Sequence, residues 1–427
     1  MKHPSRRHFL KGTLATGLMA GLWTSCQPTG SEPATSGKVS VDRSPLMVDA
    51  VNEWFYDPVM IRRIELIEVE KEQKVWFLRA FSQDGAMGLV PVNSRMKVLV
   101  PMLEELVMPF FVGKDALEIE TLIDDVYRDG RNYKFAGMPF LNCVGHVELA
   151  ILDLLGKMGG HPVADFFGTM DRYEIPVYYS TFDRENSAEV YIENLQRELE
   201  GTNFQAIKLK IGGRMSNNAD CIPGRTEKLI PLARKTFGDA MTIYVDSNGS
   251  YDVPKAMEVG KLLQDYGVAF FEEPCPWQDY AGTKAVADAL DMVVAGGEQD
   301  NSLYHFAEMI QNRTVDLIQP DMAYNGGFIR ALRVAKMAEQ VGMSITPHSP
   351  RSGPDASYML HLAALTPNMG PFQEYKPHNY PEGLFFDSSP KVDGVMTVPR
   401  GAGWGIGYDA SLFKEGRVIA AVDAPAQ

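Results

Sequence analysis

The chain has 427 residues, of which 45% are hydrophobic and 22% are charged. This length calls for two domains or one large barrel, and the composition is that of an ordinary globular protein. The formal net charge of −14 argues against nucleic acid as a partner and gives no general attraction for an anionic ligand. Local lysines or a metal ion could still bind an anion, because the local field outweighs the distant average.

The first 44 residues differ in composition from the rest of the chain. Arg6 and Arg7 precede HFLKG and then the apolar stretch TLATGLMAGLW, which is too short to span a bilayer. This pattern resembles a twin-arginine export signal, which is an address and not part of the fold. The following stretch, up to residue 44, is rich in Pro, Ser, Thr and Gly and is predicted to be a flexible tether. We therefore expect a periplasmic protein.

Cys26 follows Trp23, Thr24 and Ser25 in a pattern that loosely resembles a lipobox. Trp23 stands where such motifs usually have Leu, so two alternatives stay open: a lipoprotein anchored through Cys26, or a protein without lipid. The remaining cysteines predict neither a disulfide framework nor a zinc site, because they are odd in number and show no paired spacing: Cys143, Cys221 and Cys275.

Residues 45–170 are predicted to form an α+β domain. The segment from Ile61 to Val92 alternates apolar and polar residues and turns at Asp84-Gly85, as a β-meander does. Three later segments show the apolar spacing of helices, with Gly near their ends: VLVPMLEELVMPFFVG, ALEIETLIDDVYRDG and NCVGHVELAILDLLGKMGG.

From residue 171 to 380 the pattern changes to alternating strands and helices. Eight short apolar runs recur about every 25–35 residues, the period of one βα unit. A doubly wound sheet rarely has so many successive units, and no G-x-G-x-x-G follows the first run. We therefore predict a TIM-like barrel of parallel strands. Residues 381–427, rich in Gly and Pro near their start, are expected to fold back against the first domain.

Polar side chains gather where these eight runs end. A parallel barrel brings all its strand ends to one mouth, so residues distant in sequence would meet there. In chain order the runs supply Tyr178, Lys208 and Lys210, Asp246 and Asn248, Glu272, Glu298, Asp321, His348, and Glu374.

Lys208 and Lys210 are two residues apart, so in a strand both point to the same side. In an exposed sheet that side would face water. The outer face of a parallel barrel is covered by helices and must be apolar, which turns the lysines inward. We expect each ammonium to lower the pKa of the other, which would make one of them a base near neutral pH.

Asp246, Glu272 and Glu298 are predicted to end three consecutive strands. A single acidic residue at a strand end is usually a helix cap or a solvated carboxylate, but three in successive units favour a metal site. Hard oxygen ligands without nearby His or Cys favour Mg²⁺. Asn248 shares a face with Asp246 and would either bind substrate or orient a ligand. Glu273 is predicted to point away, into an ion pair in the barrel wall.

Asp321 and His348 end the next two runs. A carboxylate that holds one imidazole nitrogen fixes the tautomer and aims the other nitrogen. Glu374 ends the eighth run, and we consider two roles for it: a salt bridge to Lys376, or a protonated acid that donates to a substrate carboxylate.

The ordered set K-x-K, V-D-x-N, EEP, GGE, P-D…GG, PH and Glu374 resembles the enolase superfamily, mandelate racemase subgroup. The likeness extends to DG-x-x-G near Asp84 and to ELAILDLLGKMGGHPVADFFG, which are similar to that family's N-terminal capping domain. It implies an α/β fold, a (β/α)7β barrel with an N-terminal α+β capping domain. The muconate-lactonizing subgroup is disfavoured, because Asp321 stands where that subgroup has a second lysine. Gly401 and Trp404 depart from the family's usual Pro and Leu.

The resemblance also implies roles. It assigns Mg²⁺ to Asp246, Glu272 and Glu298, and makes Lys210 the base on one face of the substrate, with Lys208 lowering its pKa and contacting the substrate carboxylate. His348, paired with Asp321, would be the acid or base on the other face. Glu374 would stabilise the enediolate.

The expected reaction is removal of the proton α to a carboxylate, followed most often in such proteins by dehydration of an acid sugar to a 2-keto-3-deoxy acid. The alternatives are a racemase or epimerase of a 2-hydroxy acid, and a non-catalytic lipoprotein that binds sugar acids. We also expect a small-molecule carboxylate as substrate and a homo-oligomer.

Overall fold

A computed structural model describes residues 38–70, 74–377, 383–386, 392–414 and 416–425. The predicted export signal with Arg6 and Arg7, the lipobox-like Cys26 and most of the tether lie outside the described residues.

Within this described part, eight parallel strands form one curled sheet in the order β10-β9-β8-β7-β6-β5-β4-β11. The two ends of the sheet meet through a parallel bridge between Ile345 and Met369, just before β11. The strands are β4 (Glu174–Ser180), β5 (Ala206–Lys210), β6 (Thr242–Asp246), β7 (Phe270–Glu272), β8 (Val293–Gly296), β9 (Leu317–Ile318), β10 (Ser344–Ile345) and β11 (Gln373–Tyr375).

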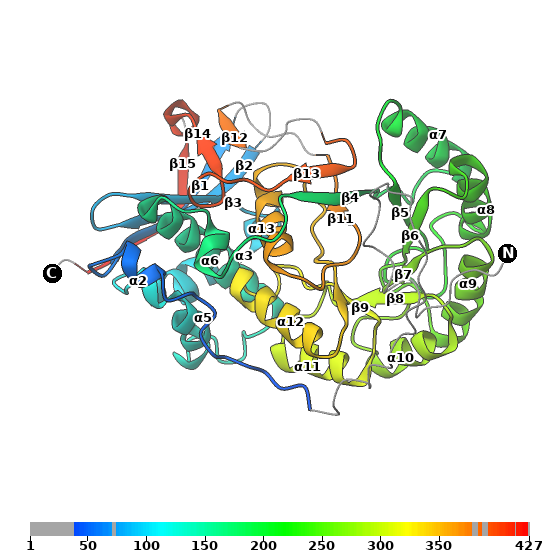
Figure 1. Ribbon diagram of the computed structural model, residues 1–427, viewed down its shortest axis with the longest axis horizontal. Coiled ribbons are helices and arrows are strands. Elements are labelled where there is room, and N and C mark those ends of the chain that lie inside the picture. Colours follow the sequence, from blue (N-terminus) through cyan, green and yellow to red (C-terminus); the bar gives the residue numbers. More distant parts are fainter. Residues whose placement is uncertain (1–37, 71–73, 378–382, 387–391, 415, 426–427) are drawn as a thin grey trace, which may run out of the picture.

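A helix follows each of the first seven strands, and these helices lie outside the curled sheet (Figure 1). They are α7 (Ala188–Leu199), α8 (Arg225–Phe237), α9 (Val253–Asp265), α10 (Tyr280–Ala289), α11 (Leu303–Asn312), α12 (Phe328–Gln340) and α13 (Ser357–Leu365). The predicted barrel architecture is confirmed.

The strands are buried on both faces, and this determines which side chains enter the barrel. Ile207 and Leu209 belong to the main hydrophobic core. On the inner side, Tyr244 stacks on Phe270 with ring centroids 3.8 Å apart, within a separate apolar cluster. Two residues further along β5, β6 and β7 the inner side chains are polar, because alternate residues share a face. The apolar cluster therefore lies directly beneath the polar layer inside the barrel.

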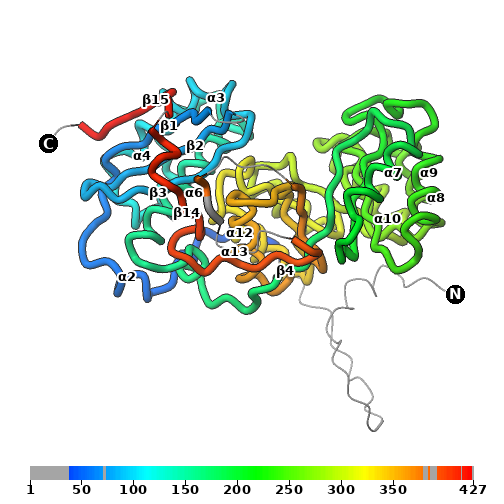
Figure 2. Tube along the Cα trace, turned by 90° about the horizontal axis from the view of Figure 1, so that it is seen from above, coloured from blue at the N-terminus to red at the C-terminus, as the bar shows by residue number. Residues whose placement is uncertain are grey.

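An antiparallel sheet of order β15-β1-β2-β3 forms the cap. β15, from the C-terminal end, runs beside β1, red next to blue in Figure 2. The strands are β1 (Ile61–Glu70), β2 (Lys74–Ser82), β3 (Met87–Pro91) and β15 (Arg417–Asp423). Helices of this part are α2 (Val51–Trp54), α3 (Met96–Met102), α4 (Met108–Phe111), α5 (Ile119–Arg128) and α6 (Met138–Gly159), with a π-helical turn at Leu103–Val107.

Short elements complete the described chain. β13 (Val395–Thr397) pairs with β4, and β12 (Leu384–Phe386) pairs with β14 (Ile406–Tyr408). Single helical turns lie at Ala116–Glu118, Val163–Phe166, Pro354–Ala356 and Ala410–Phe413.

Helix α6 packs against β3 without a gap, since a Cβ at Gly88 would collide with the helix backbone at Ala150. By length and composition alone α6 could cross a membrane, but 83% of its apolar window is buried inside the protein. It is therefore a core helix of the cap.

Glu148 of α6 joins the cap to the barrel. Its carboxylate accepts hydrogen bonds from the N–H groups of Phe328 (2.7 Å) and Ile329 (2.9 Å), in the first turn of α12. Burial raises the pKa of Glu148 to about 8. Gly327 has φ +125°, and a Cβ there would collide with this carboxylate. A side chain of α6 therefore binds the free N–H groups at the start of the barrel helix α12.

Replacing Glu148 with Ala is expected to destabilise the protein by about 1–3 kcal/mol for each N–H group left without an acceptor. Urea unfolding of Glu148→Ala measures this loss. Glu339→Ala, an exposed change on α12, is the control. Equal stability of the two variants would contradict the role of Glu148.

Candidate active site

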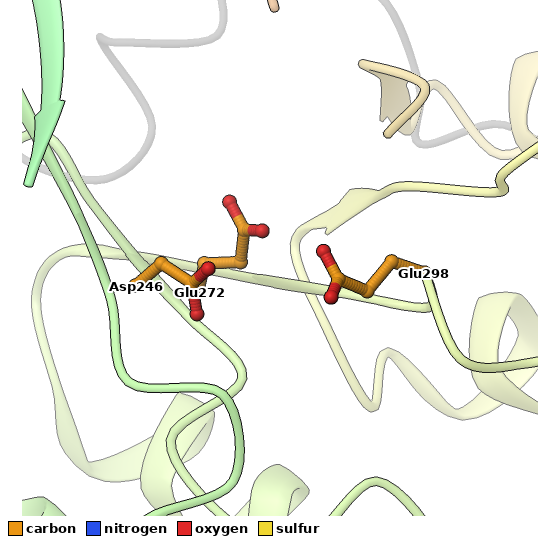
Figure 3. A group of neighbouring side chains, drawn as sticks. All are labelled: Asp246, Glu272 and Glu298. Atoms are coloured by element: carbon orange, nitrogen blue, oxygen red, sulfur yellow. The ribbon is translucent and has the colours of Figure 1, made fainter. Parts of the chain in front are cut away.

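Three carboxylates converge at the carboxyl ends of β6, β7 and β8. Asp246 and Glu272 are the last residues of neighbouring strands and are paired in register. Glu298 follows β8 after one residue, Gly297, and its side chain extends toward the other two (Figure 3). One oxygen from each residue lies within 4.8 Å of the others. The predicted metal ligands are therefore close together.

The donor set fits a divalent cation held by oxygen. Asp246 and Glu272 are fully buried, and burying ionised carboxylates so close together is unfavourable without compensating positive charge. Oε2 of Glu298 is buried and accepts no hydrogen bond from any described residue. Three hard oxygen ligands are typical of Mg²⁺ or Ca²⁺ sites.

Lys208 and Lys210 point into the barrel, as expected, with 0% and 3% of their surface exposed. Nζ of Lys208 lies 2.9 Å from Oε2 of Glu272 and 2.9 Å from Oε1 of Glu374. Nζ of Lys210 contacts Oδ2 of Asp246. Both side chains are therefore paired with carboxylates of the site.

The expected lowering of a lysine pKa is wrong for Lys208. Burial alone would lower the pKa of Lys208, but the charges of Glu272 and Glu374 raise it well above its ordinary value. The two carboxylates outweigh burial, so Lys208 is a stable cation.

His348 and Asp321 form the predicted pair. Nδ1 of His348 lies 2.7 Å from Oδ2 of Asp321. The other oxygen of Asp321 accepts the N–H groups of Ala323 (2.8 Å) and Tyr324 (3.0 Å), which fix the carboxylate. Nε2 of His348 lies 3.4 Å from Oε2 of Glu298. Asp321 therefore aims the imidazole at the carboxylate cluster.

Charge determines the protonation of His348. Burial would lower its pKa, but Glu298 and the hydrogen bond to Asp321 raise the pKa to about 10. In this arrangement the imidazole is protonated and can donate a proton.

Glu374 is held by three donors. Oε1 accepts Oγ–H of Ser180 (2.7 Å) as well as Lys208, and Oε2 accepts the N–H of Ser349 (2.9 Å). Burial would raise its pKa, but Lys208 and His348 hold the pKa well below its ordinary value. Glu374 is thus ionised and paired with Lys208, which corrects both the protonated carboxyl and the Lys376 salt bridge considered from the sequence.

Glu273 does not point away from the site, which corrects the sequence prediction. Its φ of +44° ends the strand alternation, and its carboxylate accepts hydrogen bonds from Asn248 Nδ2 (3.1 Å) and Gln299 Nε2 (3.0 Å). These partners are neutral amides, so the expected ion pair in the barrel wall is replaced by hydrogen bonds.

Besides Ser180 and Ser349, three further polar residues of the site were not expected from the sequence. Gln319 donates to Oε2 of Glu272 (3.0 Å), and its position two residues before Asp321 could have revealed it. Gln299 follows Glu298 directly. Arg184 arrives from the loop after β4, where no local pattern marks it, and donates to Oδ1 of Asn248 (2.7 Å).

Comparisons with known proteins agree with this architecture. The model of the enolase C-terminal domain-like family matches residues 190–412. Arabinonate dehydratase of Saccharolobus solfataricus is 27% identical over 73% of this chain and 82% of its own length. D-galactarolactone cycloisomerase of Agrobacterium fabrum is 27% identical over 72% of this chain and 82% of its own length.

Solved structures share the fold over nearly their whole length. A protein of Roseobacter denitrificans has a TM-score of 0.78 and 34% identity, covering 85% of this chain and 100% of its own. A mandelate racemase/muconate lactonizing protein of Paracoccus denitrificans has a TM-score of 0.78 at 23% identity, over 85% of this chain and 99% of its own.

The model of the twin-arginine translocation signal matches residues 3–23, which confirms the predicted export route and implies a location outside the cytoplasm. The curated relatives named above are a dehydratase and a cycloisomerase, which removes the non-catalytic alternative. The fold, the arrangement of the site and the family match over residues 190–412 lead to one conclusion. The chain belongs to the enolase C-terminal domain-like family and is an enzyme of the enolase superfamily.

Proposed function

We propose that this protein catalyses the Mg²⁺-dependent dehydration of an acid sugar to a 2-keto-3-deoxy acid, beginning with removal of the proton α to the carboxylate. One observation carries the proposal. The carboxylate cluster has an amine at one end, Lys210 beside Asp246, and an imidazole at the other, His348 at 3.4 Å from Glu298. This elimination needs a base and an acid on either side of a substrate whose carboxylate is bound at the metal site.

Asp246, Glu272 and Glu298 are the residues that would hold Mg²⁺. When bound, the ion supplies positive charge beside the substrate carboxylate, where negative charge develops as the α proton leaves. Lys208 adds a second positive charge, because Glu272 and Glu374 hold its ammonium in place. Preorganised charge of this kind is usually the largest catalytic contribution.

Lys210 is proposed as the base that takes the α proton. His348 is proposed as the acid that protonates the β-hydroxyl group as it departs with the C–O electron pair, so that water leaves. Asp321 holds the imidazole in position and balances its charge. Glu374 is proposed to act through Lys208 on the enediolate.

The dehydratase of Saccharolobus solfataricus, which matches 73% of this chain, supports dehydration, and the cycloisomerase of Agrobacterium fabrum, which matches 72%, supports the isomerase alternative. Racemisation or epimerisation would use the same two groups, with His348 returning a proton to the α carbon. The domain division at residues 44, 170 and 380, lipidation of Cys26 and a homo-oligomeric state stay predictions.

Incubation of the mature protein with Mg²⁺ and a panel of acid sugars in D₂O tests the reaction. We expect loss of water and a 2-keto-3-deoxy product by NMR and mass spectrometry. Deuterium at the α carbon with inversion and no water loss would identify a racemase or epimerase instead. Neither change across a broad panel would contradict the proposal.

Lys210→Ala and His348→Ala are each expected to lower turnover by about 10²–10⁴-fold, the usual contribution of a general acid or base. Steady-state kinetics measure the loss, and Lys261→Ala, an exposed change on α9, is the control. Full activity in either variant would remove the role assigned to that residue.

Mg²⁺ added to protein treated with EDTA is expected to raise the thermal midpoint. A free Mg²⁺ concentration 100 times the dissociation constant would stabilise the folded protein by about 2.7 kcal/mol. Asp246→Asn should lose this shift, whereas the exposed control Asp265→Asn should keep it. An equal shift in both variants would place the ion elsewhere.

A further inference from the structure

The side-chain amide of Asn248 is fully engaged by protein groups. Its Oδ1 accepts a hydrogen bond from Nη2 of Arg184 at 2.7 Å. Its Nδ2 donates to Oε2 of Glu273 at 3.1 Å and to Oε1 of Glu298 at 3.2 Å. The arginine bond sets the orientation of the amide, because it leaves the NH₂ group facing the two carboxylates.

Arg184 and Glu273 are themselves held in place. Arg184 is 5% exposed, and its Nε donates to the carbonyl of Ile211 at 3.2 Å. Glu273 is 4% exposed and accepts two hydrogen bonds from Nε2 of Gln299, at 3.0 and 3.2 Å. A buried network of this kind is rigid when its members are paired.

Two residues of this network have an unfavourable backbone conformation. Glu273 has φ +44° and Asn248 has φ +43°, both in the left-handed region that non-glycine residues seldom adopt. Such conformations persist where the surroundings impose them, and they gather at functional sites. Here the turn brings Glu273 back toward the carboxylate cluster, although the preceding Glu272 already faces it.

Glu298 is the ligand that needs such support. Asp246 and Glu272 are fixed by strand pairing in β6 and β7. Glu298 lies beyond the end of β8, after Gly297 with φ +114°, so no strand pairing fixes it. Among the described residues its carboxylate accepts a hydrogen bond from Asn248, and Nε2 of His348 lies 3.4 Å from its other oxygen.

We propose that Arg184, Asn248 and Glu273 are positioning residues that orient the Glu298 carboxylate for metal binding. The proposal rests on the proposed function only in taking Glu298 as a metal ligand. Asn248 then orients the metal ligand Glu298 and does not contact the substrate. Glu273 takes part in the same positioning, and not in an ion pair in the barrel wall.

Calorimetric titration of Mg²⁺ into metal-free protein tests the proposal without any substrate. Asn248→Gly is the main variant, because glycine accepts the left-handed backbone while the side chain with its amide is removed. We expect Mg²⁺ to bind about 10–100-fold more weakly, the usual effect of losing a group that orients a metal ligand. The KM for an acid sugar, measured at saturating Mg²⁺, should rise by much less.

Glu273→Gln is the second variant, and it keeps the size of the side chain while placing an NH₂ group against other donors. It should weaken Mg²⁺ binding about tenfold. Glu308→Gln and Asn312→Ala, exposed changes on α11, are the matched controls and should bind Mg²⁺ as the wild type does.

Two results would overturn the proposal: Mg²⁺ affinity within about twofold of the wild type in both variants, or an unchanged affinity with a raised KM, which is the result of a substrate contact. The wild-type titration separates this proposal from the one on which it rests. If the wild type binds no Mg²⁺, the proposed function fails; if it binds Mg²⁺ and the variants bind equally well, only the positioning role fails.

Discussion

The ammonium of Lys208 is the charge on which the site depends. It lies between the carboxylates of Glu272 and Glu374, so it joins β5 to β7 and to β11 across the inside of the barrel. All three side chains are buried, and a buried charge without a partner is strongly unfavourable. The barrel can hold so many carboxylates at its mouth because the cations of Lys208 and His348, from other strands, lie among them.

The apolar layer beneath explains why these charges stay at the mouth. Tyr178, Tyr244 and Phe270 fill the barrel two residues earlier on their strands. Water is excluded from below, so the electrostatic interactions above this layer act in a medium of low dielectric constant. The same exclusion strengthens each ion pair and makes every unpaired group costly, which accounts for the density of hydrogen bonds around Glu374 and Glu273.

The sequence predicted the barrel and the strand-end residues well, for a physical reason. Alternate side chains share a face, and helices cover the outer face, so Lys208, Lys210, Asp246 and Glu272 had to point inward. The period of the βα units then brought Asp321, His348 and Glu374 to the same mouth. Their roles in the reaction remain proposals.

The errors came from interactions that a linear pattern does not contain. The pKa of Lys208 was expected to fall because only the neighbouring lysine was considered, whereas Glu272 and Glu374 arrive from distant strands. Glu273 was placed by strand alternation, but its left-handed backbone ends that alternation. Arg184 comes from a loop and was not predicted at all.

The central claim is that one carboxylate substrate lies on this metal site between Lys210 and His348. A crystal structure of the Lys210→Ala protein with Mg²⁺ and an unreacted acid sugar tests it most directly. We predict the ion on Asp246, Glu272 and Glu298, with the α carbon between residue 210 and His348. An ion bound by other residues, or an α carbon out of reach of both positions, would contradict it.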